Sequence, residues 1–141
     1  MFTKTSVFFF VLVSFVLTSS VFAELNMQDG KWEITTKTEM QGMPMAMPAT
    51  KFTQCMTKKD TVPQKPEKGQ DCKITSTKVS GDIVTWTMQC KTKEGIIDSS
   101  GKITYKNDAF DGTVNMTMDY TGSGKMQMTM IMTGKRIGEC K

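Results

Sequence analysis

The stretch from Phe110 to Met132, FDGTVNMTMDYTGSGKMQMTMIM, decides the fold, because apolar residues fill alternate positions in two successive runs. Side chains of a β-strand point alternately to its two faces, so each run predicts a strand with one buried face. The intervening Thr121-Gly122-Ser123-Gly124 is typical of a turn. We therefore expect a hairpin with a three-residue loop, Gly122 to Gly124, and three cross-strand pairs: Tyr120 with Met126, Met118 with Met128, and Met116 with Met130.

The polar residues between these apolar positions predict a solvent-facing surface on the other side of the sheet. They are Thr113, Asn115, Thr117, Asp119, Gln127, Thr129 and Thr133. One face of this hairpin is thus expected to belong to the core and the other to contact water.

The first 23 residues have the features of a secretory signal peptide. Lys4 supplies a basic start, residues 7–17 are apolar apart from Ser14, and Val21-Phe22-Ala23 suits signal peptidase. The apolar run is too short for a stable membrane span. We therefore expect a periplasmic or secreted protein with one domain, residues 24–141, and no transmembrane segment after cleavage.

Basic residues are spread along the chain, which carries 18 Lys and Arg against 14 Asp and Glu, a formal net charge of +4. Nucleic-acid binding requires a concentrated positive surface, and no stretch of this sequence provides one. Arg136 is the only arginine, which disfavours bidentate recognition of phosphates and bases. A nucleic-acid partner is therefore not expected.

The four cysteines, Cys55, Cys72, Cys90 and Cys140, predict two structural disulfides. An even number of cysteines without a Cys-x-x-Cys motif in an exported chain favours disulfides over a redox centre or a zinc site. A bridge between Cys72 and Cys90 would join the ends of one hairpin and leave Cys55 for Cys140. A bridge between Cys55 and Cys72 would instead close the polar loop between them. The sequence leaves both pairings open, and we favour the first.

Alternation and turn residues also predict the other strands. They are Lys31 to Met40 with Trp32 inward, Thr50 to Met56, Cys72 to Val79, Ile83 to Cys90 after Ser80-Gly81-Asp82, and Lys102 to Tyr105 before Asn107-Asp108. A two-residue turn at Asn107-Asp108 places Tyr105 opposite Phe110 and Ile103 opposite Gly112. Prolines and lysines between Thr61 and Asp71 predict a solvated loop.

Together these segments predict an all-β, disulfide-bonded, monomeric domain of seven or eight antiparallel strands in a curved meander. Three architectures are compatible with this pattern: a small barrel, a half-barrel and a two-layer sandwich. The inner face would be lined by methionines and by four aromatic residues: Trp32, Trp86, Tyr105 and Phe110.

Six short motifs are distributed over the chain after residue 23. They are Gly30-Lys31-Trp32-Glu33-Ile34, Thr53-Gln54-Cys55-Met56-Thr57, Val79-Ser80-Gly81, Thr85-Trp86-Thr87-Met88-Gln89-Cys90, Phe110-Asp111-Gly112-Thr113 and Gly134-Lys135-Arg136-Ile137-Gly138-Glu139-Cys140. With these motifs the chain resembles the bacterial domain-of-unknown-function family 3617 over nearly the whole of that length. The resemblance implies an exported Gram-negative envelope protein. It implies no activity and no catalytic or binding residue.

The composition disfavours catalysis. The chain has no histidine, which is the commonest general base and the commonest metal ligand. Carboxylates such as Glu33, Glu39, Asp111 and Asp119 fall on predicted solvent-facing positions, so no buried acid–base pair is expected. We therefore predict a protein without catalytic residues, enzymatic activity or a resident cofactor.

Methionine is the unusual component, with 14 residues. Its side chain is unbranched and polarisable, so a methionine-lined surface adapts to varied apolar shapes. These methionines could form an ordinary core in a structural protein without a ligand. They could also bind an apolar small molecule or a hydrophobic segment of an envelope protein. The expected lining residues are Trp32, Trp86, Met88, Tyr105, Phe110, Met116, Met118, Met128 and Met130.

A second group of methionines, Met40, Met43, Met45 and Met47, suggests an alternative function. Thioethers select Cu(I) over harder ions, so these four residues could hold Cu(I) in a periplasmic metal-binding module. The prolines that alternate with them equally predict an apolar flap over the open end of a barrel.

Overall fold

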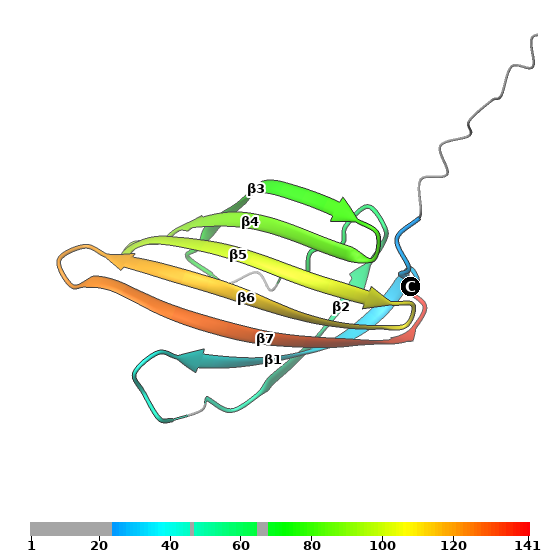
Figure 1. Ribbon diagram of the computed structural model, residues 1–141, viewed down its shortest axis with the longest axis horizontal. Helices are drawn as coiled ribbons and strands as arrows, with labels where there is room; N and C mark the ends of the chain where they lie inside the picture. The colour runs from blue at the N-terminus through cyan, green and yellow to red at the C-terminus, as the bar shows by residue number, and fades with distance from the viewer. Residues whose placement is uncertain (1–23, 46, 65–67) are drawn as a thin grey trace, which may run out of the picture.

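Seven antiparallel strands form one open, curved sheet in the computed structural model, which describes residues 24–45, 47–64 and 68–141 (Figure 1). In chain order the strands are β1 (Gly30–Met40), β2 (Thr50–Met56), β3 (Asp71–Ser80), β4 (Ile83–Lys91), β5 (Gly95–Lys106), β6 (Ala109–Tyr120) and β7 (Gly124–Gly138). Their order across the sheet is β2-β1-β7-β6-β5-β4-β3. The predicted signal peptide, residues 1–23, lies outside the described residues.

The prediction of an all-β, curved antiparallel fold is confirmed, and the half-barrel is the architecture that describes it. Strand–strand contacts occur only between neighbours in the sheet order, so the edge strands β2 and β3 do not meet. The small barrel was therefore a wrong expectation, because a barrel requires its edge strands to pair. The two-layer sandwich was also wrong, because all seven strands share one sheet.

The first and last strands pair with each other in the interior of the sheet. β1 lies between β2 and β7, and its residues from Trp32 onward pair with β7 in register, so that Thr38 faces Met130 and Met40 faces Met128. This pairing is the one departure from a simple meander, since β3 to β7 follow one another in space as in sequence. It joins segments about 90 residues apart, which no local pattern could have indicated.

The register of the β6–β7 hairpin differs from the prediction. Tyr120 pairs with Gly124, Met118 with Met126 and Met116 with Met128, so each predicted pair is displaced by two residues. The loop is Thr121-Gly122-Ser123, closed by a hydrogen bond that the amide of Ser123 donates to the carbonyl of Tyr120. Gly122 and Gly124 both have positive φ, 89° and 87°, so either glycine could have closed the turn. A shift of two residues keeps every side chain on its predicted face.

The turn at Asn107-Asp108 is confirmed, because Tyr105 pairs with Phe110 and Ile103 with Gly112. Asn107 has φ of 65°, as this two-residue turn requires. β5 itself is longer than predicted: it begins at Gly95 and includes Gly101, which lies against the ring of Trp86. A Cβ atom at Gly101 would lie 2.1 Å from Cζ2 of Trp86, so the glycine makes room for the tryptophan.

Two segments cover one end of the inner face. One is the N-terminal segment, residues 24–29, in which Leu25 and Met27 are buried. The other is the strap, residues 57–64, which follows β2 and buries Thr61 and Val62. The hydroxyl of Tyr105 donates a hydrogen bond of 2.5 Å to the carbonyl of Thr61. The prediction of a solvated loop from Thr61 was therefore wrong at its beginning, because Tyr105 holds this part of the strap in the interior.

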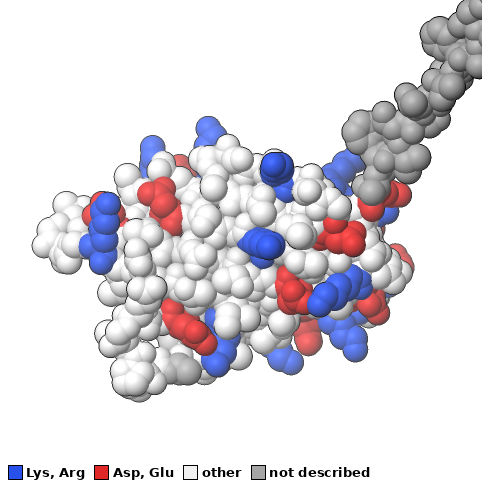
Figure 2. All heavy atoms as spheres, in the orientation of Figure 1, with Lys and Arg blue, Asp and Glu red and all other residues white. Residues whose placement is uncertain are grey.

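On the face of the molecule that Figure 2 shows, charged side chains do not segregate by sign. Figure 2 shows lysines and carboxylates interspersed over one face. The ion pairs include the close contact of Lys106 with Asp111 on the β5–β6 hairpin, 2.5 Å, where both side chains are largely exposed. Such exposed pairs contribute little to stability.

Within the described ranges, no helix is long and apolar enough to cross a membrane.

Candidate functional site

The inner face of the sheet has two ends that differ in packing, and we call the first the aromatic end. Here Trp32, Tyr105 and Phe110 contact one another, with ring centroids 5.4 to 6.1 Å apart. Each of these three side chains is at most 3% exposed, and Trp86 beside them is 4% exposed. The four aromatic residues of the predicted binding face therefore fill this end of the interior as part of the core.

The opposite end, which we call the methionine end, carries methionines on three adjacent strands: Met40, Met116, Met118, Met126, Met128 and Met130. Residues paired across antiparallel strands share a face. Met40 pairs with Met128 and Met128 with Met116, which makes one row across β1, β7 and β6. Met126 and Met118 pair in the next row. The structure thus brings Met116, Met118, Met128 and Met130 together, as predicted.

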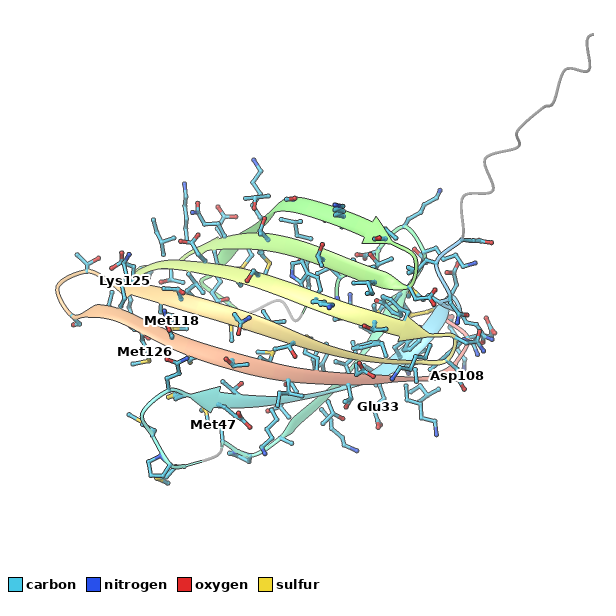
Figure 3. All side chains as sticks on the ribbon, in the orientation of Figure 1. Glu33, Met47, Asp108, Met118, Lys125 and Met126 are labelled. Carbon is cyan, nitrogen blue, oxygen red and sulfur yellow. A yellow bond between two sulfur atoms is a disulfide. The ribbon has the colours of Figure 1, made fainter. Side chains whose placement is uncertain are left out.

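The methionine end is less buried than the aromatic end. Met116 and Met130, together with Met88 on β4, are partly buried and pack against the core. Met118 is also partly buried, and Met126 is 37% exposed. In Figure 3 the labelled Met118 and Met126 lie at one end of the sheet, far from Glu33 and Asp108 at the other. Thioethers at this end therefore remain accessible, while the aromatic rings do not.

A pocket of about 410 Å³ opens at the methionine end. Inner-face side chains of Ile97, Met118 and Tyr120 form part of its wall. The remaining wall comes from Gly95, Ile96 and Asp119, from residues 68–70, which precede β3, and from the turn between β4 and β5, residues 92–94. The hydroxyl of Tyr120 lies 3.2 Å from the sulfur of Met118, to which it donates a hydrogen bond. The lining thus combines apolar side chains with four charged residues: Lys68, Lys93, Glu94 and Asp119.

The second methionine group is divided by the structure. Met40 ends β1 and is partly buried on the inner face, opposite Met128. Met43, Met45 and Met47 lie on the connection between β1 and β2 and are 60%, 80% and 45% exposed. The label of Met47 in Figure 3 marks this connection beside the edge of the sheet. Met40 therefore has Met128 as its cross-strand partner, while the amide of Met43 donates a hydrogen bond to the carbonyl of Met40.

A second pocket, about 360 Å³, lies on the outer face near the β5–β6 hairpin and collects charged residues. Its lining includes Glu33, Lys106, Asp108, Asp111 and Lys135. Opposite charges alternate there, and the Lys106–Asp111 pair takes up one carboxylate. In the part of the chain that the structure describes, no group of three or more His, Cys, Asp and Glu residues is placed to hold a metal ion.

Among the described residues, one titratable group is strongly perturbed, and it belongs to the core. Burial of Tyr105, and in second place the negative charge of Asp60, raise the pKa of its hydroxyl above the ordinary value of 10.0. The neutral hydroxyl can then donate to Thr61 throughout the physiological range. This role is structural, because the group is 1% exposed and bonded to the strap.

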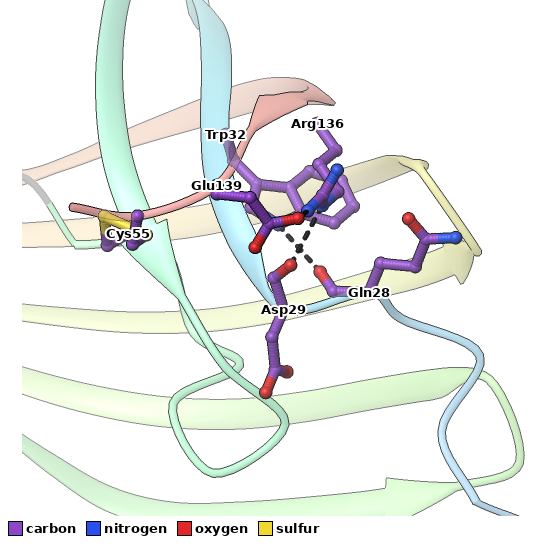
Figure 4. Close-up of a disulfide and its surroundings, with 7 residues drawn as sticks. Gln28, Asp29, Trp32, Cys55, Arg136 and Glu139 are labelled. Carbon is purple, nitrogen blue, oxygen red and sulfur yellow. Dashed lines mark hydrogen bonds and ion pairs between the residues drawn. A yellow bond between two sulfur atoms is a disulfide. The ribbon is translucent and has the colours of Figure 1, made fainter.

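Both disulfides form in the pairing that we favoured, Cys55–Cys140 and Cys72–Cys90. Figure 4 shows the surroundings of Cys55 at the aromatic end. Arg136 donates from Nε to the carbonyl of Asp29, 2.9 Å, and also pairs with Glu139. The indole of Trp32 donates to the carbonyl of Gln28, 3.1 Å. These bonds tie the N-terminal segment to β1 and to the end of β7.

Several residues of this arrangement were missed by sequence reasoning. Val62 is a lone apolar residue in a polar stretch, and its burial depends on the contact between the strap and β5. Ile97 and Tyr120 line the pocket, but β5 was predicted to begin after Ile97. The run Gly95-Ile96-Ile97 carried a usable signal, because β-branched residues favour strands.

A model of a protein family described as protein of unknown function, DUF3617, matches residues 27–140. This range contains all seven strands and both disulfides. No curated protein and no solved structure matches the chain.

Proposed function

Because the chain belongs to the DUF3617 family, whose function is unknown, we propose a function from the geometry of the inner face alone: the protein binds an apolar small molecule at the methionine end. The observation that carries this proposal is the contrast between the two ends. Four aromatic residues fill one end, whereas a pocket of about 410 Å³, lined in part by Ile97, Met118 and Tyr120, opens at the other.

The chemistry of the pocket suits a molecule with a flexible hydrocarbon chain and a polar head. Volumes of about 300 to 1,000 Å³ are typical of small-molecule sites. Burial of each CH₂ group would contribute about 0.8 kcal/mol, and methionine side chains can adjust to chains of different shape. The lining carries two lysines, Lys68 and Lys93, and two carboxylates, Glu94 and Asp119, so it can pair with a polar head group of either sign. An acyl chain with a carboxylate or phosphate head meets these requirements.

The proposal includes an exported, non-catalytic protein that carries its ligand in the cell envelope. Two disulfides are typical of proteins in oxidising compartments, which supports export. The absence of histidine from the sequence and the outer-face positions of Glu39, Asp111 and Asp119 favour binding over turnover.

The test is to purify the protein gently from the periplasm and record native mass spectra. We expect an additional mass from a bound acyl lipid, which disappears after delipidation with organic solvent. The delipidated protein should then bind a fluorescent fatty acid saturably. A wild-type protein that carries no apolar molecule and shows no saturable fatty-acid binding would contradict the proposal.

Two variants on β6 provide a matched comparison. Met118→Glu places a charge among the apolar side chains that line the pocket, and we expect fatty-acid binding to weaken at least about tenfold because the carboxylate must be desolvated. Asn115→Glu places the same charge on the exposed outer face of the same strand and should bind like wild type. Equal binding by the two variants would place the ligand elsewhere.

A further inference from the structure

We propose that Met40, Met116 and Met128 form a binding site for a soft monovalent cation, Cu(I) or Ag(I). This inference is independent of the apolar ligand, because Met118, which carries the test above, is not one of the three ligands. It differs from the sequence-based copper hypothesis in its residues: only Met40 is shared, and the loop methionines are replaced by partners on β6 and β7.

The strand register places the three thioethers in one row. Met128 lies opposite Met40 on one side and opposite Met116 on the other. Directly opposed residues have Cβ atoms about 4.5 to 5.5 Å apart. Adjacent strands lie about 4.8 Å apart, so an ion above Met128 on β7 would lie within about 5 Å, measured across the sheet, of the backbones of β1 and β6. A methionine stem with three rotatable bonds can cover this distance.

The curvature of the sheet favours this convergence. All three residues lie on the inner face, since each is separated by an even number of positions from a core residue of its own strand, Ile34, Val114 or Met132. Side chains on the inner side of a curved sheet lean toward one another, and Figure 1 shows the sheet curving across its strands. The three side chains thus extend from neighbouring strands on one face instead of from one extended backbone.

The surroundings select the class of ion. Met128 is only 8% exposed, and it is not a member of the main core cluster. Met40 and Met116 are partly buried, and Ser99, opposite Met116 on β5, is buried as well. Thioethers are neutral and soft, so they match Cu(I) and Ag(I) better than Zn²⁺ or Mg²⁺. A divalent ion would bring a second charge into this partly dry row with no carboxylate to balance it.

The loop methionines are the natural comparison. Met43, Met45 and Met47 are highly exposed, and convergence of their sulfurs would require ordering of an extended, proline-containing segment. The row on β1, β7 and β6 is already ordered by backbone pairing, so binding there loses less conformational entropy. The row should therefore bind the ion more tightly than the loop.

The experiment measures Cu(I) affinity anaerobically by competition with bicinchoninate, for wild type and two variants. One variant carries Met128→Leu with Met40→Leu, and the other carries leucine at Met43, Met45 and Met47. Mutation of a residue that only orients a metal ligand already lowers the metal affinity by about 10- to 100-fold. Removal of a ligand itself should cost at least as much. We therefore expect the row variant to bind at least about tenfold more weakly and the loop variant to bind like wild type.

A second measurement identifies the sulfurs directly. Silver(I), which is redox-inert under these conditions, is titrated into protein labelled with ¹³C at the methionine methyl groups. The methyl signals of Met40, Met116 and Met128 should shift together at one equivalent, whereas that of the buried Met56 should not move. Leucine is close to methionine in volume, so the variants should stay folded, and urea denaturation checks this.

The outcomes separate cleanly. Weakened Cu(I) binding in the row variant, with shifts confined to the row, supports the site. Weakened binding in the loop variant alone assigns the ion to the loop and overturns the inference. Equal affinities in all three proteins, or a wild type that cannot compete with bicinchoninate, also overturn it.

Discussion

Replacement of Tyr105 by phenylalanine tests how the strap is held in the interior. The substitution removes one hydroxyl, which donates a 2.5 Å hydrogen bond to the carbonyl of Thr61. Thr61 is 6% exposed, so its carbonyl would lose its side-chain partner in a dry environment. A buried group left without a partner costs about 1 to 3 kcal/mol. We expect Tyr105→Phe to lower the free energy of unfolding by about 2 kcal/mol, measured by urea denaturation with the disulfides intact.

The second tyrosine gives the matched control. The hydroxyl of Tyr120 is only partly buried and donates to the sulfur of Met118, which is a weak acceptor. Tyr120→Phe should therefore change the free energy of unfolding by less than about 0.5 kcal/mol. A loss for Tyr105→Phe no larger than that for Tyr120→Phe would refute the assignment of the strap's anchor to Tyr105.

Tyr105→Phe also tests how the free energy of unfolding depends on pH. Burial raises the pKa of Tyr105 above 10.0, so above about pH 10 the unfolded chain releases this proton while the folded protein keeps it. The stability contributed by the neutral hydroxyl is complete below pH 10 and is lost as the pH rises further. Wild type should therefore lose about 1.4 kcal/mol per pH unit more than Tyr105→Phe in this range. If the free energies of unfolding of the two proteins changed with pH in parallel, folding would not shield the Tyr105 hydroxyl from ionisation, and the reasoning would be refuted.

Two further predictions concern packing and covalent structure. Gly101→Ala would place a Cβ atom 2.1 Å from the ring of Trp86 and should lower the free energy of unfolding by about 1 to 3 kcal/mol in urea, whereas Gly138→Ala, with no atom within 4 Å, should be near neutral. Replacement of both members of the Cys55–Cys140 disulfide by serine should lower the free energy of unfolding by about 4 to 5 kcal/mol, because the bridge closes a loop of 85 residues. A change in the urea midpoint that corresponds to less than about 1 kcal/mol would contradict this entropic account.

Local patterns predicted the faces of the strands well. Alternation placed Trp32 and Phe110 inward because a strand repeats every two residues, and both are buried. The turn at Asn107-Asp108 fixed its register because few two-residue turns suit a hairpin. The turn at Gly122 and Gly124 did not determine the register of its hairpin, because two glycines offered two equivalent ways to reverse the chain.

Properties that depend on contacts between distant residues could not be predicted from local sequence patterns. Whether the sheet closes depends on which strands become its edges, and that follows from the pairing of β1 with β7. The same pairing sets Met40 beside Met128, although the sequence associates Met40 with Met43. Burial of Val62 requires the hydrogen bond between Tyr105 and the strap, which residues of the strap alone do not reveal.

The nested disulfides have a consequence for the order in which the chain can oxidise. A chain that emerges from its N-terminus presents Cys55 and then Cys72, and an oxidase that joins thiols as they appear would link these two first. Cys55 lies on β2 and Cys72 on β3, which are the opposite edges of the sheet, so this bridge is incompatible with the native fold. The native partner of Cys55 arrives 85 residues later, after the Cys72–Cys90 bridge can already have formed. A chain oxidised in this order would need thiol–disulfide exchange to reach the native pairing, and an isomerase should then accelerate its maturation more than an oxidase.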